Sequence, residues 1–161
     1  MARLKQLVIH CTATPPGREV SADDIRRWHT APPSEGGRGW KQVCYTDMIH
    51  LDGTVERLVA NNEDDTVDPW EITNGAKGYN SISRHIVYVG GVAADGKTPK
   101  DTRTPGQLKA LEDYVKDFKR RRVCCIPVKC FPMFHFLHLI SYLFLLQQLC
   151  KQIFYGRINL C

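Results

Sequence analysis

The stretch Leu4-Lys5-Gln6-Leu7-Val8-Ile9-His10 contains an apolar run, which predicts a short buried strand near the start of the chain. The polar residues Cys11–Thr14 and then Pro15-Pro16-Gly17 predict that this strand ends in a turn. Further along the chain, Ser83–Val89 predicts a second central strand, which Gly90-Gly91 closes.

The segments between and after these strands predict two helices and a hairpin. Ser21 resembles an N-cap for a helix over Ala22–His29. The turn Leu51-Asp52-Gly53 separates two alternating runs and predicts a β-hairpin. Thr104-Pro105-Gly106-Gln107 has the cap, the first-position proline and the third-position glutamine of a helix start.

After that start, one apolar helix face is predicted, made of Leu108, Leu111, Val115 and Phe118. The order strand, helix, hairpin, strand, helix predicts an α/β fold with a mixed sheet.

Composition divides the 161-residue chain into a domain, residues 1–122, and a tail, residues 123–161. Residues 1–117 hold all 17 acidic residues and 15 of the 22 basic ones, a net charge of −2. The tail region is basic and holds five of the seven cysteines and five of the six phenylalanines. Because residues 1–117 are slightly acidic, no nucleic-acid partner is predicted.

The N-terminus has only a short apolar run, so no signal peptide is predicted and synthesis in the cytoplasm is expected. An odd number of cysteines without export favours free thiols or a metal ligand over a disulfide framework.

Taken alone, the candidate functional residues leave alternatives open. His10, at the end of a strand, is either structural or a metal ligand. Tyr45, on the hairpin, is either a core aromatic or an acid/base group. The loop 75–80 contains a cation, an aromatic ring and an amide, which suit a polar ligand. His29 and His50 are interpreted as ordinary surface or half-buried histidines.

Several motifs in order resemble the type 2 N-acetylmuramoyl-L-alanine amidases, the group of the T7-type phage lysozyme and the peptidoglycan recognition proteins. The resemblance covers about residues 4–119. The motifs that carry it are Val8–Thr14, Ile25–His29, Gly39-Trp40, Val43–Tyr45, Asp52–Glu56, Ala76–Ser83, Val89–Gly91 and Thr104–Leu108.

This resemblance implies a single-domain amidase-type fold, with a mixed central sheet flanked by helices. It implies zinc-dependent hydrolysis of the amide between the lactyl group and L-alanine in peptidoglycan. On matching positions, His10 would be a zinc ligand and Tyr45 the catalytic tyrosine. Lys77, Tyr79 and Asn80 would lie near the groove that binds the glycan or stem peptide. Cys44 departs from the glycine that the family usually carries there.

The family's second histidine and its cysteine ligand, expected after the long helix, are not found. Three explanations remain open: a shifted reading frame, a membrane segment over residues 130–150, or replacement of the ligands by His135, His138 or a tail cysteine. As written, the chain is predicted to bind little zinc and to have weak or no activity. Loss of the last strand is expected to leave the sheet edge and the face of the long helix uncovered, or covered only imperfectly by the tail.

Two further functions are considered beside the enzyme. One is a non-catalytic module that binds peptidoglycan in the same groove, and the other is a redox or metal protein built on the tail cysteines. The enzyme is expected to be a monomer of phage or prophage type that reaches the cell wall only after the membrane is breached.

Overall fold

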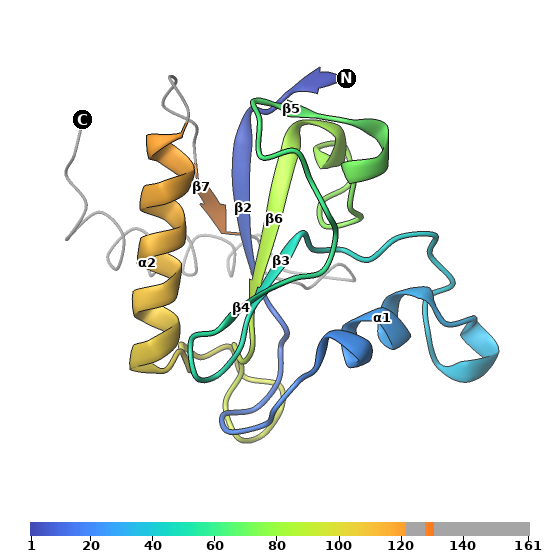
Figure 1. Cartoon of the computed structure of the whole chain (residues 1–161). Helices are drawn as coiled ribbons and strands as arrows, with labels where there is room; N and C mark the ends of the chain where they lie inside the picture. The colour runs from blue at the N-terminus through green and yellow to red at the C-terminus, as the bar shows by residue number, and fades with distance from the viewer. Residues whose placement is uncertain (122–127, 131–161) are drawn as a thin grey trace. The chain divides into compact units, whose positions relative to one another are not determined.

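The computed structural model describes residues 1–121 and 128–130, and a five-stranded sheet lies at its centre (Figure 1). Its strands are β2 (Gln6–Cys11), β3 (Asp47–Ile49), β4 (Val55–Arg57), β6 (Ser83–Tyr88) and β7 (Val128–Cys130), in the spatial order β4-β3-β6-β2-β7. Within this sheet, only β3 and β4 pair antiparallel, as the two arms of the predicted hairpin. The other pairs are parallel, so the predicted mixed sheet is confirmed.

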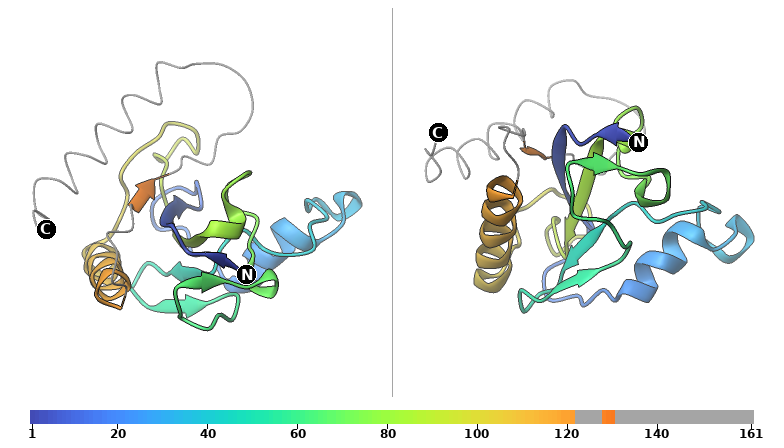
Figure 2. Two further views of the ribbon diagram at one scale, coloured as in Figure 1. Left: turned by 90° about the horizontal axis from the view of Figure 1, so that it is seen from above. Right: turned by 45° about the horizontal axis from the view of Figure 1, so that its top comes forward.

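The helices are α1 (Ala22–Thr30) and α2 (Pro105–Arg120). They lie on opposite sides of the sheet in the views of Figures 1 and 2, and the predicted α/β fold with helices flanking a mixed sheet is confirmed. Smaller elements complete the described chain. They are the two-residue strands β1 (Ala2–Arg3) and β5 (Thr66–Val67), which pair with each other, and the 3₁₀ turns Pro33–Glu35, Pro69–Glu71 and Asn80–Ile82.

Both helices begin with a capping box, which confirms the predicted N-cap at Ser21 and the predicted helix start at Thr104. At α1 the hydroxyl of Ser21 accepts from the Asp24 backbone N–H, while the Asp24 carboxylate accepts from the Ser21 N–H. At α2 Thr104 and Gln107 exchange the same two bonds. The Thr104 hydroxyl also donates to the carbonyl of Leu51 at 2.6 Å, which ties the start of α2 to the turn of the hairpin. The cap therefore fixes α2 to the sheet and also provides an acceptor for a backbone N–H in the first turn of the helix.

Replacing Thr104 with alanine is expected to lower the free energy of unfolding by about 1–2 kcal/mol, because the cap and the bond to Leu51 are lost together. Thr104→Ser keeps the hydroxyl and is the matched control. Urea denaturation of both variants measures the effect, and equal losses in the two would contradict the role of the hydroxyl.

The apolar face of α2 differs from the prediction at its first turn. Leu111, Val115 and Phe118 are buried as expected, but Leu108 is 42% exposed. Gln107 is fully buried in its place, and its side-chain amide donates to the carbonyl of Val89 at 2.9 Å. An apolar residue at this position would leave that carbonyl at the end of β6 without a partner, so here hydrogen bonding overrides the apolar pattern.

The register of the sheet decides which residues face α1. In the parallel pair of β2 and β6, His10 lies opposite Val87 and Val8 lies opposite His85. Because side chains alternate along a strand, these four residues share one face of the sheet. Val87 belongs to the buried cluster that also contains Ile25 of α1. His10 and His85 are therefore inside the layer between the sheet and α1.

The edge of the sheet beside β2 is not left uncovered, because a short piece of the tail pairs with it. β7 pairs parallel with Leu7–Ile9 of β2, so three residues after α2 take the place of an edge strand. The sequence of this part of the chain lacks the family's ligand motif, but a strand can still form there, because backbone pairing does not depend on those side chains. The division at residue 122 stays a prediction.

Two expectations about the tail lie outside the described residues. The membrane hypothesis concerns residues 130–150, of which only Cys130 is described, and the hypothesis of replaced ligands rests on His135, His138 and the tail cysteines. Within residues 1–121 and 128–130, no helix has both the length and the apolar character needed to cross a membrane.

Candidate functional site

Two of the residues predicted to be functional, His10 and Tyr45, lie side by side beneath α1. His10 is the fifth residue of β2, and Tyr45 lies just before β3, outside the strand in which the sequence placed it. Their ring centroids are 5.2 Å apart, and both side chains are almost completely buried. The strand ends thus bring together a nitrogen donor and a phenol from distant parts of the sequence.

A histidine that the sequence analysis did not single out completes this pair. Nδ1 of His85 lies 2.9 Å from Nε2 of His10, at hydrogen-bonding distance between β6 and β2. His85 is fully buried. The signal in the sequence was the polar pair Arg84-His85 inside a strand predicted to be central, where apolar residues are expected on both faces.

His29 of α1 is also part of the cluster, and its interpretation as a surface or half-buried residue is wrong. It is 3% exposed, and its ring contacts that of Tyr45 at 5.4 Å and that of Trp40 at 5.7 Å. Ile25 and His29 lie one turn apart on α1, so the face that anchors the helix also buries this ring. His50 is half-buried, as expected.

Burial keeps the three histidines neutral. Desolvation lowers the pKa of His10 to about 3, with a smaller contribution from His85, and lowers the pKa of His85 to about 4. Desolvation, assisted by Arg38, lowers the pKa of His29 to about 4. Nδ1 of His29 accepts the backbone N–H of Cys44 at 3.3 Å, a bond that only an unprotonated nitrogen can make. At neutral pH each ring therefore has one nitrogen with a lone pair.

The neighbouring phenol and thiol are protonated at neutral pH. Burial, with a further contribution from Cys44, raises the pKa of Tyr45 well above its usual value. Burial raises the pKa of Cys44 to about 12, so this residue is a buried thiol without thiolate character. Tyr45 consequently acts as a hydroxyl, able to donate a hydrogen bond, and not as a phenolate.

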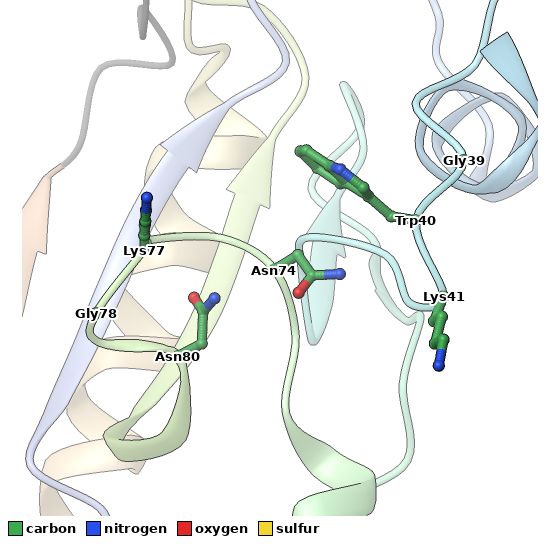
Figure 3. Close-up of a pocket in the computed structure, with 7 residues that line it drawn as sticks. All are labelled: Gly39, Trp40, Lys41, Asn74, Lys77, Gly78 and Asn80. Carbon is green, nitrogen blue, oxygen red and sulfur yellow. The ribbon is translucent and has the colours of Figure 1, made fainter.

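A pocket of about 550 Å³ opens beside this cluster (Figure 3). Its lining comes from the segment after α1 and from the loop before β6, and consists of Gly39, Trp40, Lys41, Asn74, Lys77, Gly78 and Asn80. Two lysines, two amides and one indole make it polar and cationic with a single aromatic wall. Because the Trp40 ring contacts His29 and His29 contacts Tyr45, continuous ring packing joins the pocket to His10.

The loop that forms one side of the pocket is held by hydrogen bonds between side-chain amides and backbone groups. The Asn80 carboxamide oxygen accepts the N–H of Ala76 at 2.7 Å, which closes the turn that carries Lys77. The Asn74 amide donates to the carbonyl of Gln42 at 2.8 Å, which ties this loop to the segment of Trp40. The two walls of the pocket are therefore linked before any ligand binds.

The predicted substrate residues do not all line this pocket. Lys77 and Asn80 line it, whereas Tyr79 is 41% exposed and is not among the lining residues. Trp40, Lys41 and Asn74 line it without having been proposed as ligand-binding residues. Gly39-Trp40 was noticed only as a motif, because its distance from the loop 74–80 in sequence hides their contact.

His10 fits the role of one zinc ligand, since it is a buried neutral imidazole whose other ring nitrogen is hydrogen-bonded. A complete zinc site is not present in the part of the chain that the structure describes, because no three histidine, cysteine or acidic side chains meet there as a metal would require.

Comparison with known proteins identifies relatives of this domain. The family model described as N-acetylmuramoyl-L-alanine amidase matches residues 1–128. The endolysin of Klebsiella phage KP32 is 36% identical over 114 residues, which cover 71% of this chain and 66% of that protein. The endolysin of Escherichia phage T7 is 34% identical over 105 residues, or 65% of this chain and 60% of that protein. The chain thus spans less than two thirds of the length of these relatives.

Solved structures show the same fold at lower identity. The Ph2119 endolysin from the Thermus scotoductus MAT2119 bacteriophage Ph2119 superposes with a TM-score of 0.54 at 22% identity, covering 92% of this chain and 86% of that one. Peptidoglycan recognition protein-LE, solved in complex with tracheal cytotoxin, gives a TM-score of 0.56 at 20% identity, covering 81% and 69%. The mixed sheet with its flanking helices is the fold of these proteins.

Proposed function

Because this chain belongs to the N-acetylmuramoyl-L-alanine amidase family, we propose that it acts on peptidoglycan at the amide between the lactyl group and L-alanine. The observation that carries the proposal is the contact of a buried neutral imidazole, His10, with a buried phenol, Tyr45, beside a polar pocket. We infer further that the protein meets its substrate in the cell wall once the membrane is breached.

In this proposal each residue has one task. Zinc, when bound, would polarise the scissile carbonyl and lower the pKa of a water molecule. His10 would hold the metal with one ring nitrogen, since burial leaves the ring unprotonated. Tyr45 would donate its hydroxyl hydrogen to the oxyanion that develops in the transition state, because its raised pKa keeps that hydrogen in place.

The pocket would hold the part of the substrate that flanks the scissile bond. Lys41 and Lys77 carry charges that attract the carboxylates of a stem peptide, and Trp40 offers a flat apolar face to a sugar ring or an alkyl chain. The amides of Asn74 and Asn80 provide further polar groups. This lining is the reason for assigning the pocket to peptidoglycan.

We also propose that this chain, as written, binds zinc weakly and cleaves slowly or not at all. The support is the incomplete set of ligands: His10 has no two donor side chains beside it within the described residues. A single imidazole does not hold zinc tightly, because structural and catalytic sites use three or four protein ligands. The alternative function, a module that binds muropeptide without cutting it, needs only the pocket, which does not include His10 or Tyr45.

Two measurements on the purified chain test these proposals. The first is the zinc content per chain, and the second is muropeptide binding and cleavage, each with and without a chelator. We expect well under one zinc per chain, little cleavage, and binding that persists with the chelator. One zinc per chain that disappears in His10→Ala would overturn the weak-binding proposal. If the chain neither bound nor cleaved the muropeptide, the assignment to peptidoglycan would be overturned.

Replacing Trp40 with alanine is expected to weaken muropeptide binding by about 30-fold, the effect of removing a central aromatic contact in a binding site. Trp70→Ala is the matched control, because Trp70 is 51% exposed and does not line the pocket. Isothermal titration of both variants checks the prediction. If Trp40→Ala and Trp70→Ala bound the muropeptide with equal affinity, the pocket would not be its binding site.

A further inference from the structure

The hydrogen bond between His10 and His85 is not explained by the family resemblance, and it limits what His10 can do. Nε2 of His10 faces Nδ1 of His85 at 2.9 Å, between neighbouring parallel strands. With Nε2 engaged in this way, the ring nitrogen of His10 that remains for another partner is Nδ1.

One hydrogen lies between the two facing nitrogens, because their separation of 2.9 Å is that of a hydrogen bond. If Nε2 of His10 carries it and donates to His85, Nδ1 of His10 has a lone pair. If Nδ1 of His85 donates instead, the hydrogen of the His10 ring is on Nδ1, and the ring has no nitrogen left for a metal. A metal role for His10 therefore requires that His85 be the acceptor.

The surroundings hold the His85 ring in place beside His10. The backbone N–H of Thr46 donates to the His85 carbonyl at 2.7 Å, which fixes the strand at this residue. Gly75 packs against the ring, and a Cβ at that position would lie 2.3 Å from Nδ1 of His85. Only a residue without a side chain at position 75 leaves this space for the imidazole.

The other nitrogen of His85, Nε2, is buried and has no hydrogen-bond partner among the described residues. An unpaired buried polar atom is unfavourable, so an apolar residue would suit this site better if packing were its only task. The 2.9 Å contact with His10 is the hydrogen bond that the ring does make here, which points to a task that concerns His10.

We propose that His85 is a positioning residue for His10: its Nδ1 accepts the Nε2–H of His10, so that Nδ1 of His10 is directed to the metal with its lone pair. The inference rests on the metal role of His10 proposed above. Metal-bound histidines usually donate their second ring N–H to a fixed acceptor, and loss of that acceptor typically weakens metal binding 10- to 100-fold. Here a second imidazole fills the place that a carboxylate or a carbonyl commonly takes.

The test uses the full chain labelled with ¹⁵N, and two-bond ¹H–¹⁵N spectra that show which ring nitrogen of His10 carries the hydrogen. His85→Leu removes the acceptor, and His85→Asn offers an amide oxygen close to the position of Nδ1. Val8→Ala is the packing control, because Val8 lies opposite His85 and is fully buried. Each protein is recorded without metal and then during addition of Zn²⁺.

We expect the hydrogen of His10 on Nε2 in the wild type, in His85→Asn and in Val8→Ala, but not fixed there in His85→Leu. Zn²⁺ should shift the Nδ1 signal of His10, with an affinity 10- to 100-fold lower in His85→Leu and largely restored in His85→Asn. This rescue separates positioning from packing.

Other outcomes overturn one proposal or the other. A hydrogen on Nδ1 of His10 in the wild type, or equal Zn²⁺ affinity in all four proteins, would overturn the role of His85. A Zn²⁺-induced shift at a ring nitrogen of His85 would make it a ligand instead. If Zn²⁺ shifts no nitrogen of His10 in any protein, the metal role of His10 fails. A hydrogen fixed on Nε2 in the wild type and in His85→Asn, but not in His85→Leu, would still establish the positioning contact.

Discussion

Lowering the pH from 7 to 5 is expected to reduce the free energy of unfolding of the zinc-free chain by about 2 kcal/mol for each of His10, His29 and His85. The unfolded chain takes up protons at these residues near the ordinary pKa of 6.5, whereas the folded chain does not until about pH 4 or 3. Their contribution to stability is therefore complete above pH 6.5 and is lost as the pH falls through this window.

The hydrogen bonds of these histidines also predict that the free energy of unfolding falls as the pH is lowered. Protonation of His29 would remove the acceptor of the Cys44 N–H, and protonation of the ring that accepts the hydrogen bond between His10 and His85 would place a hydrogen on both facing nitrogens. Urea denaturation at half-unit steps of pH, with a chelator present, measures the effect. His29→Asn keeps an acceptor for the Cys44 N–H but does not titrate, so its loss should be smaller by about 2 kcal/mol. A stability that is flat between pH 7 and 5 would contradict the prediction.

Replacing Asp47 with alanine is expected to destabilise the fold by about 3 kcal/mol, because its buried carboxylate joins three elements. One oxygen accepts from Nε of Arg57 on β4 at 2.7 Å, and the other accepts from the hydroxyl of Tyr114 on α2 at 2.6 Å. Asp47 itself is on β3 and is 1% exposed. Without it, the buried hydroxyl of Tyr114 loses its acceptor and Arg57 loses its buried partner.

Thermal and urea denaturation of three variants separate these contributions. Tyr114→Phe removes only one neutral donor and should cost about 1–2 kcal/mol. Asp113→Ala is the matched control, since its ion pair with Lys109 is exposed on the outer side of α2 and should change stability by less than about 1 kcal/mol. If Asp47→Ala were no more destabilising than Asp113→Ala, the buried network would not contribute to the packing of α2 on the sheet.

Much of the fold could be predicted from local signals. The caps at Ser21 and Thr104 and the turn at Leu51-Asp52-Gly53 each depend on residues within a few positions of one another, and the structure confirms them. Leu108 was predicted wrongly because the pattern of apolar residues cannot show that Gln107 is needed to satisfy the carbonyl of Val89, just after β6.

The candidate site was harder to predict, because its contacts join distant parts of the sequence. His10 and Tyr45 were found through the resemblance of their motifs. His85 was missed because its contact with His10 depends on the parallel register of β2 and β6, which no local pattern encodes. Trp40 and Asn74 form one pocket only after the segment following α1 and the loop before β6 are brought together.

The strand order affects how fast the chain folds and in which order its strands pair. β2, near the N-terminus, finds its partners at residues 83–88 and 128–130, so both of its ladders require closure of long loops. The hairpin of β3 and β4 is the sheet pairing between strands close in sequence. Long-range parallel pairing is slow because chain entropy must be lost before the contacts compensate for it. On a ribosome, β2 would therefore wait unpaired until β6 had been synthesised, and the histidine cluster would form only at that late step.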